Sequence, residues 1–322
     1  MKLTKRNLIA VILLAVVVYG GFTIFSGYEE IAKRLASFRW TAFAAACALA
    51  MGNYLIRFMK WQFYLRRLSI RNVPTFDSLL VFLSGFVLTL TPGKIGETYK
   101  SFLLRDGWGI PVGRTASIVV AERITDVIGI IVLIVLGSLG WSGGLMWAVI
   151  GGCLVILCMA VIISDTFMEW GIRIAGRLPG KFARRLEPAV RESWHSLRTI
   201  TTPYSLIYPS LLSIFAWALE GIALAFILHG FDTWAPLPAV IFFYSTATLA
   251  GAVIPVPGGL GITEGMIEGQ LRLVGGIPLD ISTAAMILVR FATLWFSVAI
   301  GFAALAWFKA RHKISVASEF KI

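Results

Sequence analysis

The chain has 322 residues, of which 58% are hydrophobic and only 14% are charged. A soluble domain carries about 25% charged residues, so this composition excludes an ordinary soluble protein and indicates a membrane protein. The formal net charge of +12 is typical of some nucleic-acid-binding proteins, but here the basic residues lie between long apolar runs and cannot form one continuous basic face. The three cysteines and three widely separated histidines lack the spacing of a disulfide framework or a metal site. We therefore expect no cofactor, no metal and no nucleic-acid partner.

The first apolar run extends from Leu8 to Phe25 and follows three basic residues, as in a signal peptide. No A-x-A-like cleavage site follows it, so we expect an uncleaved signal-anchor helix. Residues 27–39 come next and combine acidic, basic and apolar side chains at helical spacing. This pattern predicts a short amphipathic helix on the outer membrane surface.

Five later apolar segments are long enough, at about 1.5 Å per residue, to cross about 30 Å of hydrocarbon. They cover residues 40–59, 115–140, 144–163, 205–228 and 280–308. Two further apolar segments, residues 75–91 and 238–256, stop at Pro-Gly clusters and precede shorter amphipathic runs, a pattern typical of re-entrant hairpins. The predicted fold is therefore an all-α polytopic membrane protein with about six transmembrane helices plus two re-entrant helical hairpins.

The distribution of basic residues predicts the orientation of the chain. If both hairpins return to the side from which they enter, most basic residues lie on the side of the two termini, and Lys60 and Lys100 are counted there. The positive-inside rule then places both termini in the cytoplasm. If the hairpins were full spans, Lys100, Arg105 and Arg114 would lie outside, so the charge distribution favours hairpins.

Aligning the two Pro-Gly clusters reveals an internal repeat. The matched residues share the pattern Pro-Gly-x-x-Gly, a glutamate, a Gly-Ile-Pro motif and an arginine; they are Pro92, Gly93, Gly96, Glu97, Gly109-Ile110-Pro111 and Arg123 against Pro257, Gly258, Gly261, Glu264, Gly276-Ile277-Pro278 and Arg290. In the predicted topology the first hairpin enters from the cytoplasm and the second from outside. Inverted-topology repeats with broken helices are typical of transporters.

The repeat suggests one membrane domain over residues 1–322. Its parts are a signal-anchor helix and outer amphipathic segment (1–39), repeat A (40–141) with hairpin 75–104, a connecting helix and basic cytoplasmic loop (142–203), repeat B (204–308) with hairpin 238–274, and a basic cytoplasmic tail (309–322).

The tip of the first hairpin has the chemistry of an anion site. Glycine lets the backbone approach a ligand closely, and the N–H groups at the start of the returning helix favour negative charge. Lys94 adds a full positive charge between Gly93 and Gly96. The second tip, made of Pro257, Gly258, Gly259 and Gly261, has no lysine, so the two halves are not equivalent.

A charged side chain at membrane depth costs free energy unless it faces the interior of the protein and forms an ion pair. The ionisable side chains at this depth are Arg57, Lys94, Arg123 and Arg290 against Glu97, Glu122, Asp126, Glu220, Glu264 and Glu268. Glu97 and Arg123 are 26 residues apart, and so are Glu264 and Arg290. This equal spacing predicts two symmetry-related carboxylate–guanidinium contacts, which either latch helices together or line a cavity.

Three of these side chains have more than one interpretation. Glu122 and Asp126 flank Arg123 within one helical turn and either neutralise it or relay protons. Arg57, one turn after Asn53, either reaches the cytoplasmic interface or lines a cavity.

The motifs LTPGKIGETYKSFLLR (Leu90–Arg105), ERITD (Glu122–Asp126) and PVPGGLGITEG (Pro255–Gly265) resemble those of the lysylphosphatidylglycerol synthase transmembrane-region family. This flippase-like domain occurs alone in inner-membrane proteins and is fused to an aminoacyl-lipid synthetase in bacterial multiple-peptide-resistance factors. The resemblance implies a standalone member without the synthetase, in a bacterial inner membrane. It also implies a central cavity for a lipid head group; the residues expected to line it are Lys94, Glu97, Arg123, Asp126, Glu264 and Arg290.

We therefore predict a flippase, not an enzyme, that moves an anionic lipid of the phospholipid or polyprenyl-phosphate type between leaflets. The sequence has no Walker motif, so transport would be downhill or coupled to protons or membrane potential, with Asp126, Glu97 or Glu264 as proton carriers. The alternatives are an intramembrane lipid-phosphate enzyme and a non-transporting partner of a membrane glycosyltransferase. A homodimer, or a complex with a glycosyltransferase or lipid-modifying enzyme, also remains open.

Overall fold

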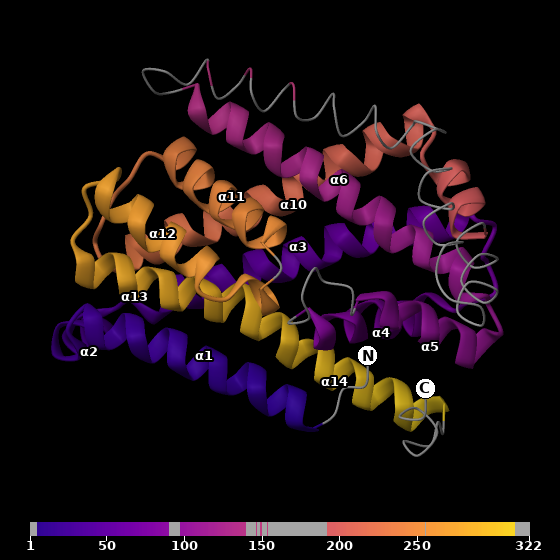
Figure 1. Ribbon diagram of the computed structural model, residues 1–322, viewed down its shortest axis with the longest axis horizontal. Helices are drawn as coiled ribbons and strands as arrows, with labels where there is room; N and C mark the ends of the chain where they lie inside the picture. The colour runs from indigo at the N-terminus through magenta and orange to yellow at the C-terminus, as the bar shows by residue number, and fades with distance from the viewer. Residues whose placement is uncertain are drawn as a thin grey trace, which may run out of the picture.

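The computed structural model describes residues 5–89, 97–139, 192–254 and 256–312, with residues 146, 149 and 153. Within these ranges the regular secondary structure is helical, and the long helices lie along the longest axis of the molecule (Figure 1). The first Pro-Gly tip, most of the predicted span 144–163 and most of the basic loop 164–203 lie outside the described residues.

The N-terminal predictions are confirmed as helices. α1 (Lys5–Phe25) corresponds to the predicted signal anchor, and α2 (Tyr28–Ser37) corresponds to the predicted amphipathic segment. In α2 the apolar Ile31 is buried, while Glu29, Glu30 and Lys33 are exposed, as expected for an amphipathic helix.

Three described helices are long and apolar enough to cross a membrane. The first is α3 (Trp40–Arg67), and the second lies in α10 (Pro203–Gly230). The third is the continuous segment Leu279–His312, which contains α13 (Leu279–Arg290), a π-helical turn, η4 (Phe291–Trp295), and α14 (Phe296–His312). α6 (Val112–Ser138) is similarly long but carries charged residues in its middle. The chain thus has the helical spans of a membrane protein.

Each of the two segments that the sequence predicts as a hairpin contains two helices that pack on each other. α4 (Thr75–Ser84) continues into the 3-10 turn η1 (Gly85–Leu88) and packs on α5 (Tyr99–Trp108). α11 (Leu237–Val253) is followed by η3 (Pro257–Gly259) and packs on α12 (Ile262–Leu273). The two pairs lie toward opposite ends of the molecule (Figure 1).

The backbone repeats around the two Gly-Ile-Pro motifs. Gly109 follows α5 with φ 68°, and Gly276 lies between α12 and α13 with φ 66°, a left-handed conformation that favours glycine. Each motif then ends in a proline, Pro111 or Pro278, which directly precedes the long helix of its repeat. The sequence duplication therefore corresponds to a repeated short helix, left-handed glycine and long helix.

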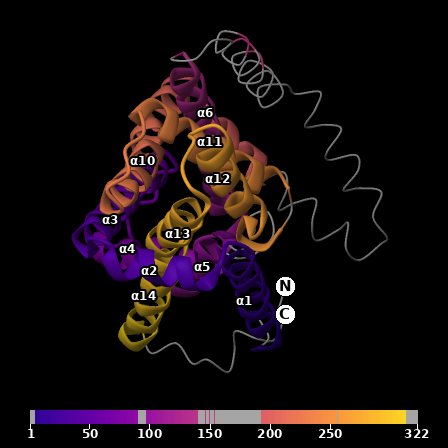
Figure 2. The same ribbon diagram turned by 90° about the vertical axis from the view of Figure 1, so that its left-hand side faces the viewer.

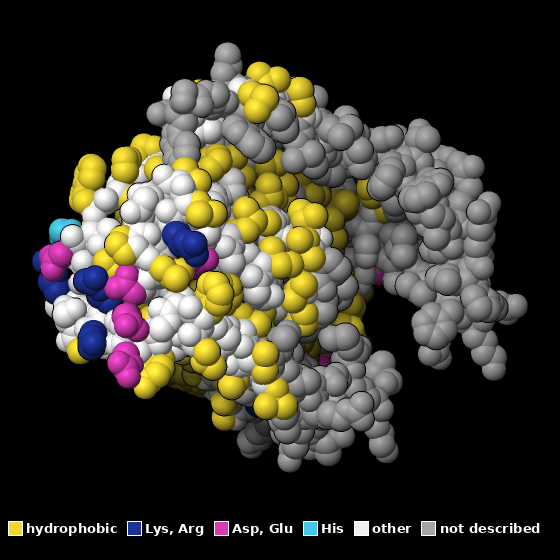
Figure 3. Space-filling model, turned by 60° about the vertical axis from the view of Figure 1, so that its left-hand side comes forward, with side chains coloured by type: hydrophobic (Ala, Val, Ile, Leu, Met, Phe, Trp, Pro, Cys, Tyr) yellow, Lys and Arg dark blue, Asp and Glu magenta, His cyan; other side chains and the backbone are white. Residues whose placement is uncertain are grey.

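The helices pack around two buried hydrophobic clusters. One joins α3, α6, α10, α11 and α13, and the other joins α3, α4, α5, α6 and α14. Figure 2 shows α3 and α10 on one side of the bundle, α1 on the other and α13 between them. On the face in Figure 3, hydrophobic side chains cover much of the middle, and many charged side chains gather near the left edge. This division suits a bundle whose middle lies in lipid.

α6 and α10 approach each other closely at Gly129. A Cβ atom added there would lie 2.8 Å from Cβ of Ser213 and 2.9 Å from the backbone nitrogen of Ile214. Small residues at such crossings let the backbones of membrane helices pack together.

We expect Gly129→Ala to destabilise the protein by about 1–3 kcal/mol, because the methyl group would push α6 away from α10. Gly269→Ala on α12 is the matched control, since a Cβ at Gly269 meets nothing within 4 Å. Thermal unfolding of both variants in detergent measures the difference. Equal midpoints for the two variants would show that the crossing tolerates a larger residue.

Candidate functional site

A cluster of ionised side chains lies buried where α3, α5 and α6 meet. Its members form ion pairs at 2.7–3.7 Å, and most are less than 10% exposed. We call this set the A cluster; it consists of Arg57, Lys60, Glu97, Lys100, Glu122, Arg123 and Asp126. Helical spacing explains the arrangement within each element, because residues three or four apart lie on the same helix face.

Glu97 joins two helices through two guanidinium groups. Its Oε2 accepts a hydrogen bond of 3.0 Å from Nη2 of Arg123 on α6, and its Oε1 lies 3.7 Å from Nη2 of Arg57 on α3. The predicted contact between Glu97 and Arg123 is therefore confirmed. Arg57 is 8% exposed, with its guanidinium beside the rings of Phe86 and Trp217, so it does not reach the interface.

Asp126 is the centre of a second set of contacts in the A cluster. Lys60 Nζ donates to Asp126 Oδ1 at 2.7 Å and to Ser213 Oγ at 2.6 Å, and the Ser213 hydroxyl also donates to Asp126 at 3.0 Å. Arg123 lies 3.1 Å from the other carboxylate oxygen of Asp126. Asp126 thus ties α3 and α10 to α6, next to the close crossing at Gly129.

Lys100 forms the third ion pair of the cluster. Its Nζ lies 2.7 Å from Glu122 Oε2 and 4.6 Å from the centre of the Trp61 ring. Of the two acidic residues that flank Arg123, the structure therefore pairs Asp126 with Arg123 and Glu122 with Lys100.

The sequence-based location of Lys60 and Lys100 was wrong. Both were counted as basic residues of the cytoplasmic face, but they are 1% and 2% exposed. The charge rule counts residues between apolar segments, whereas α3 continues as one helix through Lys60 to Arg67. The available signal was helical spacing, since Lys60 follows Arg57 by three residues on the same face of α3.

A second buried cluster lies at the corresponding place in repeat B. Glu264 Oε1 accepts hydrogen bonds from Arg290 Nε at 2.6 Å and from the Tyr19 hydroxyl at 3.1 Å. Glu264 Oε2 accepts one from the backbone N–H of Gly261 at 2.8 Å, and Arg290 donates to the carbonyl of Gly258 at 2.8 Å. The predicted Glu264–Arg290 contact is confirmed, and we call these residues the B cluster.

Glycine shapes the second tip as the sequence predicts. Gly258, Gly259 and Gly261 have φ angles of 63°, 68° and 86°, all in the left-handed region. Pro257 begins the 3-10 turn η3 within this tip. In the first tip, Pro92, Gly93, Lys94 and Gly96 lie outside the described residues.

The remaining predicted acidic residues are not in either cluster. Glu220 on α10 accepts a 2.6 Å hydrogen bond from the hydroxyl of Tyr244 on α11. Glu268 lies one turn after Glu264 and 3.9 Å from Arg272 on the same helix. In the part of the chain that the structure describes, no group of histidine, cysteine and acidic side chains could hold a metal ion.

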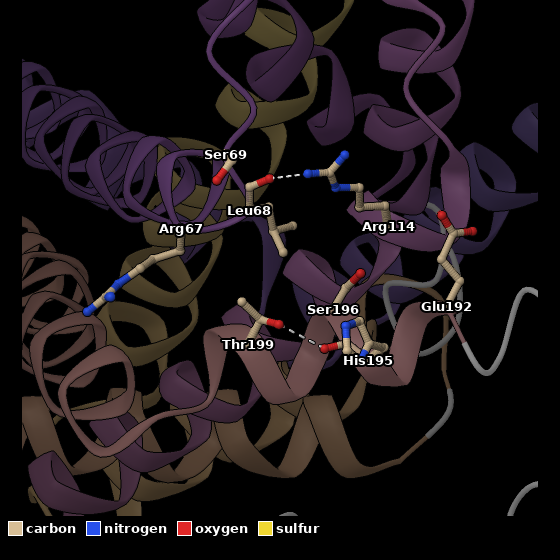
Figure 4. Close-up of a pocket in the computed structure, with 8 residues that line it drawn as sticks. All are labelled: Arg67, Leu68, Ser69, Arg114, Glu192, His195, Ser196 and Thr199. Atoms are coloured by element: carbon tan, nitrogen blue, oxygen red, sulfur yellow. Dashed lines mark hydrogen bonds between the residues drawn. The ribbon is translucent and has the colours of Figure 1, made fainter.

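An open pocket of about 340 Å³ lies apart from both clusters, where α3 ends and α6 begins (Figure 4). Its lining consists of Arg67, Leu68, Ser69, Arg114, Glu192, His195, Ser196 and Thr199. In this pocket Arg114 donates to the carbonyl oxygen of Leu68. None of the predicted site residues lines it, so the candidate site is the buried A cluster together with the B cluster.

We expect Glu264→Ala to cost about 3–5 kcal/mol of stability, because removal of one partner leaves Arg290 buried without its carboxylate. Glu268→Ala, one turn along the same helix, is the control and should cost less than about 1 kcal/mol, because its ion pair is long and its partner is exposed. Thermal unfolding in detergent gives both values. A Glu264→Ala variant as stable as the Glu268→Ala variant would contradict the structural role of the B cluster.

Comparison with known proteins agrees with the resemblance in the motifs. Residues 12–301 match the family described as "Lysylphosphatidylglycerol synthase TM region". Two relatives named "UPF0104 membrane protein" come from Methanothermobacter thermautotrophicus: one is 26% identical over 272 residues, 78% of this chain and 80% of its own, and the other is 23% identical over 334 residues, 94% of each. "UPF0104 membrane protein MJ1078" of Methanocaldococcus jannaschii is 21% identical over 237 residues, 71% of this chain and 96% of its own. Because the family match extends over most of the sequence, the chain belongs to the lysylphosphatidylglycerol synthase transmembrane-region family of membrane proteins.

Proposed function

We propose that this protein moves an anionic lipid, of the phospholipid or polyprenyl-phosphate type, between the leaflets of a membrane. The observation that carries the proposal is the A cluster, in which two guanidinium groups from different helices share one carboxylate inside an apolar bundle. Guanidinium groups recognise carboxylate and phosphate oxygens with the same planar geometry. A site that holds a carboxylate in this way also suits a lipid phosphate.

The short helices support a re-entrant topology. α5 has 10 residues and α12 has 12, so at about 1.5 Å per residue each rises about 15–18 Å, roughly half of the hydrocarbon thickness. Their hairpins lie toward opposite ends of the molecule (Figure 1), which suits two repeats of inverted orientation. We therefore retain six crossings and two re-entrant hairpins as part of the proposal.

The proposed location is the cytoplasmic (inner) membrane of a bacterium, with both termini in the cytoplasm. α1 begins and α14 ends toward the same end of the molecule (Figure 1), as this orientation requires. The last turn of α14 carries Lys309 and Arg311, which also favours the cytoplasmic side.

We propose no catalytic residue. The hydroxyl of Ser213 lies 2.6 Å from Lys60, an arrangement that an intramembrane enzyme could use for nucleophilic attack. However, Nζ of Lys60 also contacts Asp126 at 2.7 Å, so Lys60 links two side chains of neighbouring helices. Ser213 is fully buried against α6. These contacts favour a structural role for the hydroxyl.

Transport would be downhill or coupled to protons or membrane potential, because the sequence has no Walker motif. Glu97, Asp126 and Glu264 are the proposed proton carriers, since each lies in a buried ion pair that protonation would break.

Leaflet transfer of fluorescent phosphatidylglycerol in proteoliposomes tests the proposal. We expect transfer by the unmodified protein and at least about tenfold slower transfer by Arg123→Gln, which loses a charge-assisted contact of about 1.5–3 kcal/mol. Lys94→Ala should also slow transfer if the first tip binds the head group. Arg272→Gln is the control, because in the part of the chain that the structure describes this exposed arginine pairs only with Glu268, at 3.9 Å.

Size-exclusion profiles identify folded variants before the assay. Transfer equal to that of empty vesicles for every anionic lipid tried would overturn the flippase proposal. Release of phosphate from prenyl pyrophosphates would support an enzyme instead, and co-purification with a glycosyltransferase in the absence of transport would support a non-transporting partner.

A further inference from the structure

Glu97 and Glu264 occupy equivalent positions in the two repeats, and the donors that contact them among the described residues differ in kind. Glu264 accepts from Arg290, from Tyr19 and from the backbone N–H of Gly261, which begins the helix that contains Glu264. It is fully buried. This carboxylate caps its own helix and fastens it to α1 and α13, as a structural staple would.

Glu97 is instead held by cations on two other helices. Arg123 on α6 donates at 3.0 Å, and Arg57 on α3 lies 3.7 Å away, beyond normal hydrogen-bond distance. Glu97 thus lies between two guanidinium groups, and a lipid phosphate would bind the same two groups.

Both guanidinium groups are positioned by contacts other than Glu97. Arg57 packs beside Phe86 and Trp217, with its Cζ 5.4 Å and 6.0 Å from the ring centres. Arg123 also contacts Asp126, and among the described residues its Nε is buried without a hydrogen-bond partner. A buried donor without a partner is costly, so Arg123 retains the capacity to bind a further oxygen atom.

The charge of the cluster constrains what can replace Glu97. If the Glu97 carboxylate left the guanidinium groups with nothing in its place, two buried cations would lose a negative charge at a large energetic cost. A phosphodiester also carries one negative charge at neutral pH, and its two free oxygens can accept from both arginines. Exchange of one monoanion for the other therefore preserves the charge of the site.

We infer that Glu97 is an internal substitute for the lipid phosphate: it occupies Arg57 and Arg123 in the lipid-free protein and is displaced when the phosphate of an anionic lipid binds between them. This inference rests on the proposed function for the identity of the ligand. Glu264 takes no part in this exchange and keeps its contacts with Arg290, Tyr19 and Gly261 while the lipid phosphate binds. The two repeats thus use the same glutamate–arginine spacing for different purposes.

Equilibrium binding of phosphatidylglycerol to detergent-solubilised protein, measured by native mass spectrometry, tests the inference. Glu97→Gln removes the competing charge, so we expect about tenfold tighter binding of phosphatidylglycerol together with a lower unfolding temperature without lipid. Glu264→Gln should lower the unfolding temperature without tightening binding. Arg57→Gln should weaken binding at least tenfold.

Two ligand controls identify what is recognised. Diacylglycerol, which lacks the phosphate, should bind equally to the unmodified protein and to Glu97→Gln. Glycerophosphoglycerol, the phosphodiester head group without its acyl chains, should show the same preference for Glu97→Gln if the head group alone is sufficient, and no preference if the acyl chains are needed. Glu97→Asp, which keeps the charge on a shorter side chain, replaces Glu97→Gln if the latter does not fold, and should bind phosphatidylglycerol more tightly than the unmodified protein.

The results separate this inference from the proposed function. Binding of phosphatidylglycerol by Glu97→Gln or Glu97→Asp that is no tighter than that of the unmodified protein overturns the exchange, even if proteoliposomes transport lipid. Absence of phosphatidylglycerol binding to all of these proteins also overturns it. Tighter binding by Glu97→Gln with no leaflet transfer by the unmodified protein would support the exchange and contradict the flippase proposal.

Discussion

Burial of full charges inside an apolar bundle is the constraint on which this structure depends. An unpaired charge at the middle of a bilayer costs about 2.5–3.5 kcal/mol even on the insertion scale, so each buried cation needs a carboxylate from another element. In the A cluster the carboxylates come from α6 and from Glu97, which precedes α5; the cations come from α3, α5 and α6, and α10 contributes Ser213. Formation of the ion pairs therefore requires contacts between the same helices that pack together in the hydrophobic clusters.

Close helix packing makes this pairing geometrically feasible. Gly129 lets α6 approach α10 where Ser213 contacts both Lys60 and Asp126. A larger residue at the crossing would separate the backbones and lengthen these short contacts. Gly129 and the charged side chains are thus parts of one arrangement, because the close approach of the helices at the glycine allows the short contacts.

The two repeats have diverged in charge while keeping the same backbone plan. The B cluster has one buried, balanced pair, Glu264 with Arg290, which is completed by a tyrosine and a backbone amide. Repeat A has an extended set of cations and carboxylates in which Glu97 bridges two arginines. This difference in charge is the asymmetry on which the proposed exchange at Glu97 depends. The open pocket at the end of α3 belongs to neither set.

The sequence by itself determined the all-helical fold, the described helical segments, and the Glu97–Arg123 and Glu264–Arg290 contacts. The signals were local or repeated: the length of the apolar runs, the Pro-Gly breaks and a common spacing of 26 residues. Such signals can be recognised without knowledge of how the helices pack. Only the tertiary structure placed Lys60 in the A cluster, because its partners Asp126 and Ser213 are 66 and 153 residues away. Contacts between distant segments depend on which helix faces pack together. Helical periodicity shows which residues share a face, but it does not show which other helix packs against that face.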